Sequence, residues 1–139
     1  MDLPEKYLTI KRSGITGAGK GLFTKEFIAK GTKIVEYAGS ITTWKDVMAQ
    51  TQFNGYVYYI KRNIVIDAKP YKKTFGRYAN DANGITKIKN VKNNSRYIIE
   101  GTKVFIEAFK NINAGDEIFV SYGKEYWDTV RYNKRLGYT

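Results

Sequence analysis

Short runs of β-branched and aromatic residues, interrupted by turn residues roughly every ten positions, constrain the fold of this chain more than any other feature. The runs occupy residues 7–12, 33–39, 56–60, 64–67, 95–100, 104–108 and 113–122. Where two runs are separated by only a few polar or glycine residues, at 56–67 and 95–108, the spacing predicts β-hairpins. Helical segments do not alternate with the strands, which excludes a parallel βαβ sheet. We therefore predict a mainly β protein made of several small sheets.

Helices are predicted at only two places. Thr43 has the side chain of an N-cap, and Asp46 follows three residues later, so a short helix should begin there and end near Ala49. The tail, residues 126–137, has helical spacing of apolar residues and ends in charged residues and a glycine. A loop with one helical turn is expected at 69–82 and an exposed connection at 84–94. The 139 residues are long enough for one domain, and we expect residues 1–139 to form a single one.

The chain contains no histidine and no cysteine. It therefore cannot form a Ser-His-Asp or Cys-His nucleophile system, a zinc site with the usual nitrogen and sulfur ligands, or a disulfide. An enzyme built from it must rely on tyrosine, lysine, carboxylates, backbone groups or a bound organic cofactor. We expect no metal in the site, and nothing in the residue types indicates an oxidising compartment.

Lysine and arginine outnumber the acidic residues by 24 to 13, which gives a formal net charge of +11. Such a charge favours contact with nucleic acid, anionic surfaces or acidic proteins, although a soluble surface with scattered basic residues explains it equally well. The N-terminus lacks a basic region followed by an apolar run, and no apolar run is long enough to span a bilayer. We therefore expect an intracellular protein, cytoplasmic or nuclear, that is neither secreted nor in a membrane.

Residues 113–122 combine a polar turn with a strand-like alternation that ends in a tyrosine followed by a glycine. In a strand, Ile118, Val120 and Tyr122 share one face while the intervening residues share the other. Tyr122 is therefore predicted to point inward, where its hydroxyl needs a hydrogen-bond partner. On this stretch alone, a core tyrosine bonded to a carbonyl is a more common explanation than a functional residue.

Residues 14–21 contain four glycines. Such a density indicates a backbone that turns sharply or is closely approached by another group. A glycine-rich turn without a ligand and a loop that binds a charged group through its backbone are both compatible with it. A phosphate-binding loop is excluded, because no Gly-Lys-Ser/Thr sequence opens a following helix.

Four separated stretches, in order and with fitting spacing, resemble the SET domain, the fold of protein lysine methyltransferases. Residues 17–23 are similar to the family's glycine-rich opening, 37–39 to its Tyr-x-Gly, 76–82 to its Arg-Phe-Ile-Asn-His-Ser, and 105–122 to its Ala-x-Arg-Asp-Ile, Gly-Glu-Glu and catalytic tyrosine. The resemblance covers about residues 10–123 and leaves 124–139 as a C-terminal helical extension. It implies a SET-domain fold of several small β-sheets with a pseudoknot-like C-terminal segment and a short C-terminal helix.

The resemblance also implies a binding site for S-adenosyl-L-methionine, with S-adenosyl-L-homocysteine as the product. The glycine-rich loop contributes backbone contacts, Asn80 binds the polar end, and Trp127 or Tyr126 is available to stack on adenine. The cofactor-binding residues that it implies are Ala18, Gly19, Lys20, Gly21, Asn80, Asp81, Tyr122 and Trp127. Many relatives close this site with a cysteine-rich zinc segment. This chain has no cysteine, so the C-terminal helix is the available substitute.

Tyr122 takes the catalytic role by the same resemblance, which places Tyr37 and Tyr97 in the wall of a lysine channel. A methyl group is transferred to a neutral amine, and both desolvation among tyrosine rings and the positive charge of the sulfonium lower the pKa of that amine. Tyrosine hydroxyls and carbonyl oxygens then orient the amine and hold the methyl group by C–H···O contacts. The number of methyl groups added stays open, because Val120 stands where the family often has a space-limiting aromatic residue.

The sequence thus predicts a protein lysine methyltransferase that acts on a protein or peptide, with a histone, a histone-like protein or another nucleic-acid-associated protein as candidate substrates. A basic β-domain that binds nucleic acid is one alternative. A SET fold without catalytic turnover is the other, because Asp81 and Ala82 replace the family's histidine and serine. Asn80 and Asp81 in an Asx turn, Tyr97 as an ordinary strand residue, and Trp127 as a helix anchor are the structural alternatives.

The substrate and the oligomeric state are not specified by the sequence. A basic histone tail would need an acidic groove, for which Glu36, Asp67 and Glu107 are candidates. A homodimer that completes the site is compatible with so short a chain, although no segment of the sequence indicates an interface.

Overall fold

The computed structural model describes residues 3–50, 54–84, 87–123 and 126–128, together with Arg131 and Arg135. Within these residues the chain is mainly β, which confirms the predicted fold class. The elements, in chain order, are η1 (Glu5–Tyr7), β1 (Leu8–Arg12), β2 (Lys20–Thr24), β3 (Lys33–Glu36), β4 (Ser40–Thr42), α1 (Trp44–Met48), β5 (Val57–Lys61), β6 (Ile64–Asp67), η2 (Gly76–Tyr78), β7 (Ser95–Glu100) and β8 (Lys103–Ala108).

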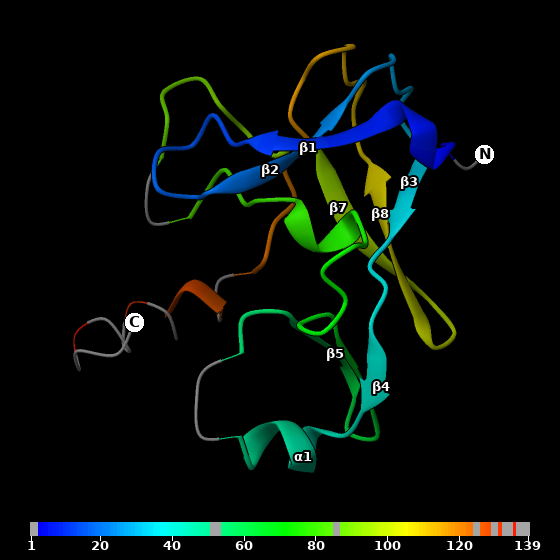
Figure 1. Ribbon diagram of the computed structural model, residues 1–139, viewed down its shortest axis with the longest axis vertical. Helices are drawn as coiled ribbons and strands as arrows, with labels where there is room; N and C mark the ends of the chain where they lie inside the picture. Colours follow the sequence, from blue (N-terminus) through cyan, green and yellow to red (C-terminus); the bar gives the residue numbers. More distant parts are fainter. Residues whose placement is uncertain are drawn as a thin grey trace.

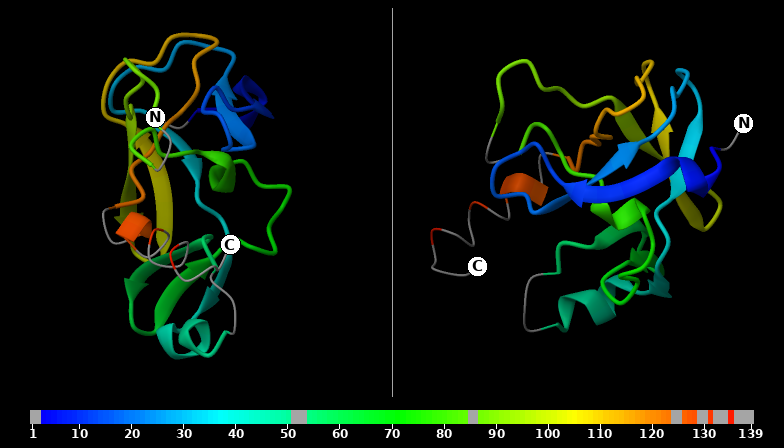
Figure 2. Two further views of the ribbon diagram at one scale, coloured as in Figure 1. Left: turned by 90° about the vertical axis from the view of Figure 1, so that its left-hand side faces the viewer. Right: turned by 45° about the horizontal axis from the view of Figure 1, so that its top comes forward.

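The described strands form three small antiparallel sheets, with the orders β1-β2, β3-β8-β7 and β4-β6-β5. In Figure 1 the β1-β2 pair crosses the upper part of the molecule, β4 and β5 lie with α1 at the lower end, and β3, β7 and β8 occupy the space between. Both views in Figure 2 keep this order along the long axis. The sheets therefore follow one another along the molecule, and loops connect them.

Both predicted hairpins are present. Strands β5 and β6 pair from Val57 opposite Asp67, and β7 and β8 pair in register from Ser95 opposite Ala108. The short helix α1 is also confirmed, and the Thr43 Oγ1 accepts a hydrogen bond from the Asp46 N–H at 3.2 Å, as expected of an N-cap. These elements were predictable because local periodicity and turn residues specify them.

Residues 113–122 differ from the prediction. They were expected to form a strand with one inward face, but residues 117–120 make only single bridges, to Phe23, Asn80 and Ser95. Both faces are covered: Ile118 and Val120 are fully buried, and Glu117 and Phe119 are 7% and 8% exposed. We call residues 117–122 the central segment.

Three separate parts of the chain satisfy the backbone of the central segment. The Ile118 N–H donates to the Leu22 carbonyl at 2.7 Å, the Val120 N–H donates to the Asn80 carbonyl at 2.8 Å, and the Phe119 carbonyl accepts from the backbone of Ser95 at 3.0 Å. The segment therefore has β2 and the Asn80 stretch along one edge and the start of β7 along the other. Its parallel bridges to Asn80 and Ser95 form the pseudoknot-like arrangement expected of the fold.

The connections and the tail agree with the prediction only in part. Strands β2 and β4 were not predicted, because the first begins inside the glycine-rich stretch and the second follows Gly39 directly. The turn η2 confirms the helical turn expected at 69–82. Residues 126–128 are helical, as are Arg131 and Arg135, while the rest of the predicted C-terminal helix lies outside the described residues.

No helix in the described ranges is both long and apolar enough to cross a membrane.

The main core lies where β1, β2, β3 and β8 meet the central segment. Its fully buried members include Leu22, Ile34, Ile106 and Ile118. A second cluster, around Tyr37, Ile66 and Val104, joins this core to the β4-β6-β5 sheet. Burial of aliphatic side chains of this size stabilises a protein by roughly 1.5–3 kcal/mol each. The central segment is thus fixed by both hydrogen bonds and packing.

Gly39 shows how closely two connections approach each other. A Cβ atom at Gly39 would lie 2.5 Å from the Asp67 carbonyl oxygen, which belongs to the backbone and cannot rotate away. We expect Gly39→Ala to lower the free energy of unfolding by about 1–3 kcal/mol, because the backbone at the end of β6 would have to move. Chemical denaturation measures the change.

Gly14→Ala is the matched control. Its Cβ would meet nothing closer than a Glu117 carboxylate oxygen at 3.7 Å, which is an ordinary contact. We expect its free energy of unfolding to stay within about 1 kcal/mol of the wild type. Equal midpoints for the Gly39 variant and the wild type would contradict the close approach.

Candidate functional site

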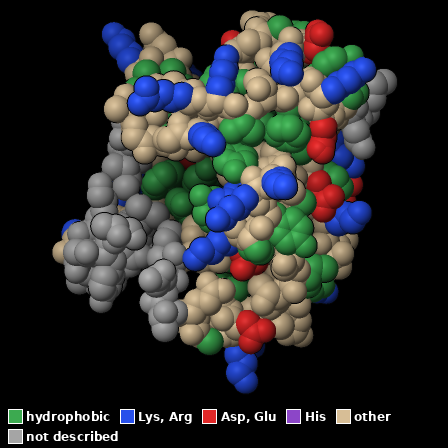
Figure 3. Space-filling model, in the orientation of Figure 1, with side chains coloured by type: hydrophobic (Ala, Val, Ile, Leu, Met, Phe, Trp, Pro, Cys, Tyr) green, Lys and Arg blue, Asp and Glu red, His purple; other side chains and the backbone are tan. Residues whose placement is uncertain are grey.

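One large cavity of about 760 Å³ lies among the glycine-rich loop, the ends of β3 and β5, η2 and the C-terminal residues. It is lined by Ile15, Thr16, Gly17, Ala18, Gly19, Lys20, Tyr37, Gly55, Tyr56, Val57, Tyr58, Arg77, Tyr78, Asn80, Asp81, Gly84, Tyr97, Tyr122, Tyr126 and Trp127. Figure 3 shows a hollow on this face with hydrophobic side chains inside it and Lys and Arg side chains beside it. The volume falls within the range of small-molecule sites.

The glycine-rich loop presents bare backbone at the cavity. Gly17 and Gly19 have φ values of +84° and +73°, and a Cβ atom on either would meet nothing within 4 Å. The Ser13 N–H donates to the Gly19 carbonyl at 2.8 Å and closes the base of the loop. Glycine is therefore needed here for the backbone conformation, and the open space in front of it leaves room for a ligand.

A buried carboxylate holds this loop to the central segment. Glu117 accepts hydrogen bonds from the Ser13 hydroxyl at 2.7 Å and from the Gly14 N–H at 2.9 Å. It also accepts one from the Asn80 amide at 3.3 Å, and that amide donates to the Lys20 carbonyl at 3.0 Å. Hydrogen bonds to an ionised acceptor are stronger than neutral ones. The loop and the Asn80 stretch are therefore held in a fixed relation.

Gly21 lies behind this carboxylate and does not line the cavity. A Cβ atom there would lie 2.3 Å from a Glu117 carboxylate oxygen. Of the residues proposed from the sequence as cofactor contacts, Gly21 is thus the one that the structure separates from the others. Its glycine is explained by packing against Glu117 inside β2.

Tyr122 ends the central segment and enters the cavity. Its hydroxyl donates to the Ala79 carbonyl, and its backbone N–H donates to an Asp81 carboxylate oxygen at 2.8 Å. Burial raises the pKa of the Tyr122 phenol well above its ordinary value of about 10, and the neighbouring Tyr126 and Tyr37 add to the effect. The phenol therefore stays protonated, and its oxygen lone pairs remain available to accept.

Three tyrosine rings form a second wall. The ring centroids of Tyr97 lie 5.6 Å from those of Tyr37 and 4.9 Å from those of Tyr58. The Tyr37 hydroxyl donates to the Tyr56 carbonyl at 2.7 Å. Burial is the main cause that raises the pKa of Tyr37, of Tyr58 and of Tyr97 above the ordinary value. All three rings are neutral hydrogen-bonding groups at physiological pH.

Arg77 brings a positive charge to the same cavity. Its guanidinium lies 4.0 Å above the Tyr56 ring, and its Nη1 donates to the Ala68 and Lys69 carbonyls at 3.1 and 2.7 Å. The Arg77 Nε is buried and has no partner among the described residues. A fixed cation beside an aromatic wall disfavours a second cation in that space.

Trp127 covers the other end of the cavity. Its indole is stacked on Tyr122, with centroids 5.7 Å apart and planes inclined by 15°, and its Nε1 donates to Asp81 at 2.8 Å. Tyr126 lies edge-on to both rings. The nine site residues proposed from the sequence other than Gly21, with the catalytic candidate Tyr122 among them, thus all line one cavity.

Several lining residues were missed in the sequence. Tyr56 and Tyr58 were read only as part of a strand, although residues two apart on a strand share a face. Arg77 stands at the arginine of the 76–82 motif but was given no role in the site, and Gly84 carried no signal of its own. Their role follows from contacts with residues far away in the chain, so only the folded structure reveals them.

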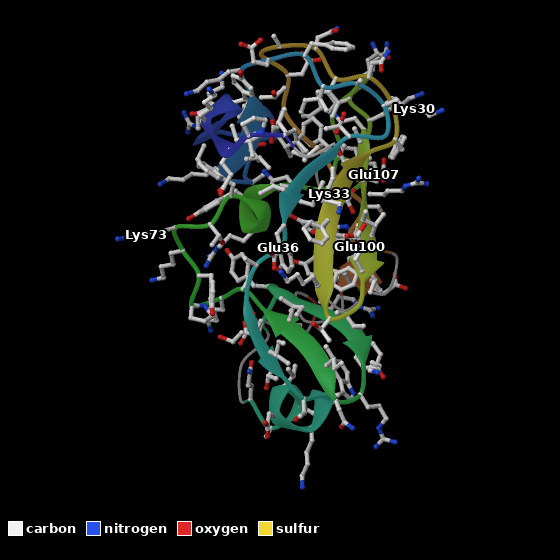
Figure 4. All side chains as sticks on the ribbon, turned by 90° about the vertical axis from the view of Figure 1, so that its right-hand side faces the viewer. Lys30, Lys33, Glu36, Lys73, Glu100 and Glu107 are labelled. Atoms are coloured by element: carbon white, nitrogen blue, oxygen red, sulfur yellow. The ribbon has the colours of Figure 1, made fainter. Side chains whose placement is uncertain are left out.

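The acidic candidates for a histone groove lie elsewhere. Glu36 and Glu107 are on the β3-β8-β7 sheet, where Figure 4 shows them with Lys33 and Glu100. Glu107 pairs with Arg96 at 2.9 Å, and the Asp67 carboxylate accepts from Asn54 and from the Lys69 N–H. None of the three lines the large cavity. Within the described part of the chain, no cluster of metal-ligating side chains occurs either.

Comparisons with known proteins agree with this geometry. A family model described as SET domain matches residues 19–123. The chain is 26% identical over 133 residues to the histone-lysine N-methyltransferase EZH2 of Chaetomium thermophilum, an alignment that covers 87% of this chain and 8% of that protein. The chain thus spans a small part of the curated relative that it matches.

A similar solved structure is the methyltransferase domain of human PR domain-containing protein 2. The TM-score is 0.61 at 23% sequence identity, and the match covers 87% of this chain and 79% of that one. At this identity, the likeness supports the fold alone.

Because the pKa values of the buried tyrosines are raised, the free energy of unfolding should fall as the pH rises above about 10. A phenol whose folded pKa is raised contributes stability that is complete below its unfolded pKa, near 10, and is lost as the pH rises toward the folded pKa. Each such group lowers the free energy of unfolding by about 1.4 kcal/mol per pH unit in that window. We expect Tyr97→Phe to reduce this slope by about that amount, as measured by denaturation at several pH values above 9.

Tyr59→Phe is the control, because Tyr59 is 46% exposed and lies outside the cavity. The same slope in the Tyr97 variant and the wild type would contradict a buried, neutral Tyr97.

Proposed function

The chain belongs to the SET-domain family, and we propose that it is a protein lysine methyltransferase that uses S-adenosyl-L-methionine. One observation carries the proposal: a single cavity is lined by the bare glycine-rich loop and by Tyr122, Tyr37 and Tyr97. Methyltransferases of this family use that cofactor. A methyl donor held at the loop would therefore share a cavity with phenols that can orient an amine. We further propose that residues 1–139 act as one unit, with the extension at 124–139 completing the site.

The cavity suits a cofactor of this kind. The unoccluded backbone of Gly17, Ala18 and Gly19 offers N–H and C=O groups to a zwitterionic ligand. Asn80 is held by Lys20 and Glu117, so its remaining amide oxygen has a fixed direction. Trp127 and Tyr126 supply flat rings for a purine base. The proposed reaction needs no metal.

S-adenosyl-L-methionine supplies a methyl group on a positively charged sulfur. The lysine ammonium would first lose a proton to water; in the transfer the carbon–sulfur bond would then break as a carbon–nitrogen bond forms, giving S-adenosyl-L-homocysteine and a methylated ammonium. We propose that Tyr122 orients the attacking amine. Its hydroxyl hydrogen is engaged by the Ala79 carbonyl, so the phenol oxygen can accept from the amine N–H or from the methyl C–H.

The tyrosine wall and Arg77 would keep the substrate amine neutral. Desolvation among Tyr37, Tyr58 and Tyr97 disfavours an ammonium ion, and the Arg77 guanidinium acts in the same direction. After transfer, aromatic faces stabilise a methylated ammonium by cation–π contact. The wall therefore supports both the reactive form of the substrate and the product. Val120 is fully buried and does not line the cavity, so of Val120 and Tyr97 it is Tyr97 that limits the space for a methylated amine.

The protein substrate is proposed by class only. The curated relative is named for histone lysine, but the acidic residues that a basic tail would need do not line this cavity. We therefore propose a lysine in a protein or peptide as the acceptor, and place no weight on histones over other nucleic-acid-associated proteins. A fold without turnover is the alternative, since Asp81 replaces a family histidine.

Tyr122→Phe tests the mechanism. We expect it to keep its affinity for S-adenosyl-L-homocysteine within a few fold and to lower methyl transfer by about 10²-fold or more, because the oriented acceptor oxygen is lost. Binding is measured by titration calorimetry. Transfer is measured with labelled S-adenosylmethionine and a mixed protein extract, with methyl-lysine identified by mass spectrometry. Thermal unfolding of each variant confirms that it is folded at the assay temperature.

Tyr71→Phe, an exposed phenol outside the cavity, is the matched control and should retain full activity. Equal rates for wild type and the Tyr122 variant would remove Tyr122 from the mechanism. Tight cofactor binding without any methyl-lysine would favour a fold without turnover. No cofactor binding, together with steeply salt-dependent binding to an oligonucleotide, would favour the nucleic-acid alternative.

A further inference from the structure

Asp81 is a buried carboxylate with four neutral donors around it. It is 5% exposed. One carboxylate oxygen accepts from the Asn83 N–H at 2.8 Å and from the Asn93 amide at 2.9 Å. The other accepts from the Tyr122 N–H and from the Trp127 Nε1, both at 2.8 Å. No ion pair is found for it within the described residues.

This arrangement requires a carboxylate. An ionised carboxyl group has about four lone-pair directions and no donor, whereas a neutral imidazole accepts only one hydrogen bond and an amide also donates. Four donors therefore match aspartate and mismatch the histidine that the family has at this place. The bonds are charge-assisted, and together they offset the desolvation of the buried charge. Asp81 thus fixes the positions of the four groups that donate to it, from Asn83, Asn93, Tyr122 and Trp127.

Trp127 is fixed by two further contacts. Its ring is stacked on Tyr122 at 5.7 Å, and a Cβ atom on Gly84 would lie 2.5 Å from its Cζ2. Gly84 has no positive φ that would require glycine, so the contact with the indole is what explains the missing side chain. The indole therefore contacts both Gly84 and Tyr122, and its N–H is directed at Asp81.

We propose that Asp81 is a positioning residue that fixes Trp127 as a wall of the cofactor cavity and ties this wall to Tyr122. The inference rests on the proposed function and adds to it how this chain, without cysteine, attaches its C-terminal residues to the site. One carboxylate oxygen holds both the Tyr122 backbone and the indole, so the cofactor wall and the orienting phenol share an anchor. Loss of the anchor should weaken cofactor binding more than it slows transfer at saturating cofactor.

The test uses Trp127 as its own reporter. The chain has two tryptophans, and Trp44→Phe removes the one on α1, outside the cavity. In that background we would compare Gly84→Ala, Asp81→Asn and Trp127→Tyr. Gly84→Ala displaces the indole without altering Asp81 or Tyr122. Asp81→Asn keeps the size of the side chain, but its amide NH2 group replaces one carboxylate oxygen and faces N–H donors. Asp46→Asn, on α1, is the matched control.

Two readouts separate positioning from general stability. Tryptophan emission, followed during titration with S-adenosyl-L-homocysteine, should change in the background protein and in the Asp46 control. In Gly84→Ala and Asp81→Asn the ligand-free emission should move to longer wavelength. Their Kd for the ligand should rise about tenfold or more, an effect of about 1.4 kcal/mol. Trp127→Tyr keeps an aromatic ring but loses the indole N–H, so the Kd for S-adenosyl-L-homocysteine should rise. This variant has no tryptophan left in the Trp44→Phe background, so its Kd is measured by titration calorimetry.

In transfer assays, KM for S-adenosylmethionine should rise in Gly84→Ala by a larger factor than kcat falls. Unchanged emission and unchanged affinity in both Gly84→Ala and Asp81→Asn would overturn the inference while leaving the proposed function intact. A wild-type protein that binds no S-adenosyl-L-homocysteine would overturn both. Thermal unfolding of each variant shows that the titrated protein is folded.

Discussion

The structure depends on the backbone hydrogen bonds of one buried extended segment, residues 117–122. Buried N–H and C=O groups must be paired, and in this segment β2, the Asn80 stretch and the start of β7 each provide partners. The segment can therefore adopt its position only when parts that are distant in sequence have assembled around it. It carries Tyr122 at one end and Glu117 at the other, so the glycine-rich loop and the candidate catalytic phenol are placed by the same element.

This dependence explains which parts of the fold were predictable from the sequence. The β5-β6 and β7-β8 hairpins and α1 are specified by neighbouring residues, through alternation, turn residues and the Thr43 cap. The central segment also alternates, but alternation assigns an inward face only when the other face meets solvent. Here Phe119, on the opposite face from Ile118 and Val120, is also buried by non-local contacts. The local sequence pattern could not have predicted that both faces of this segment are buried.

The residues of the candidate site were likewise predictable only where they belong to a recognisable sequence pattern. The glycine-rich loop and Tyr122 carry recognisable patterns, and both line the cavity. Gly21 shares the pattern of the loop but faces Glu117, because a strand turns alternate residues to opposite sides. Gly84 is meaningful only beside Trp127, which comes from another part of the chain. Sequence spacing can show that a glycine is needed, but only the packing shows whether a ligand or a side chain needs it.

Two buried carboxylates compensate for the side chains that this chain lacks. Glu117 joins the glycine-rich loop to the Asn80 stretch, and Asp81 joins Tyr122 to Trp127. Both accept from neutral donors, so each charge is stabilised only as long as all its donors are in place. A partial loss therefore leaves a buried charge undersatisfied, which is worse than an apolar replacement of the whole group. In a chain without histidine or cysteine, such cooperative bonds are a physical means by which a small β protein can hold a cavity in one shape.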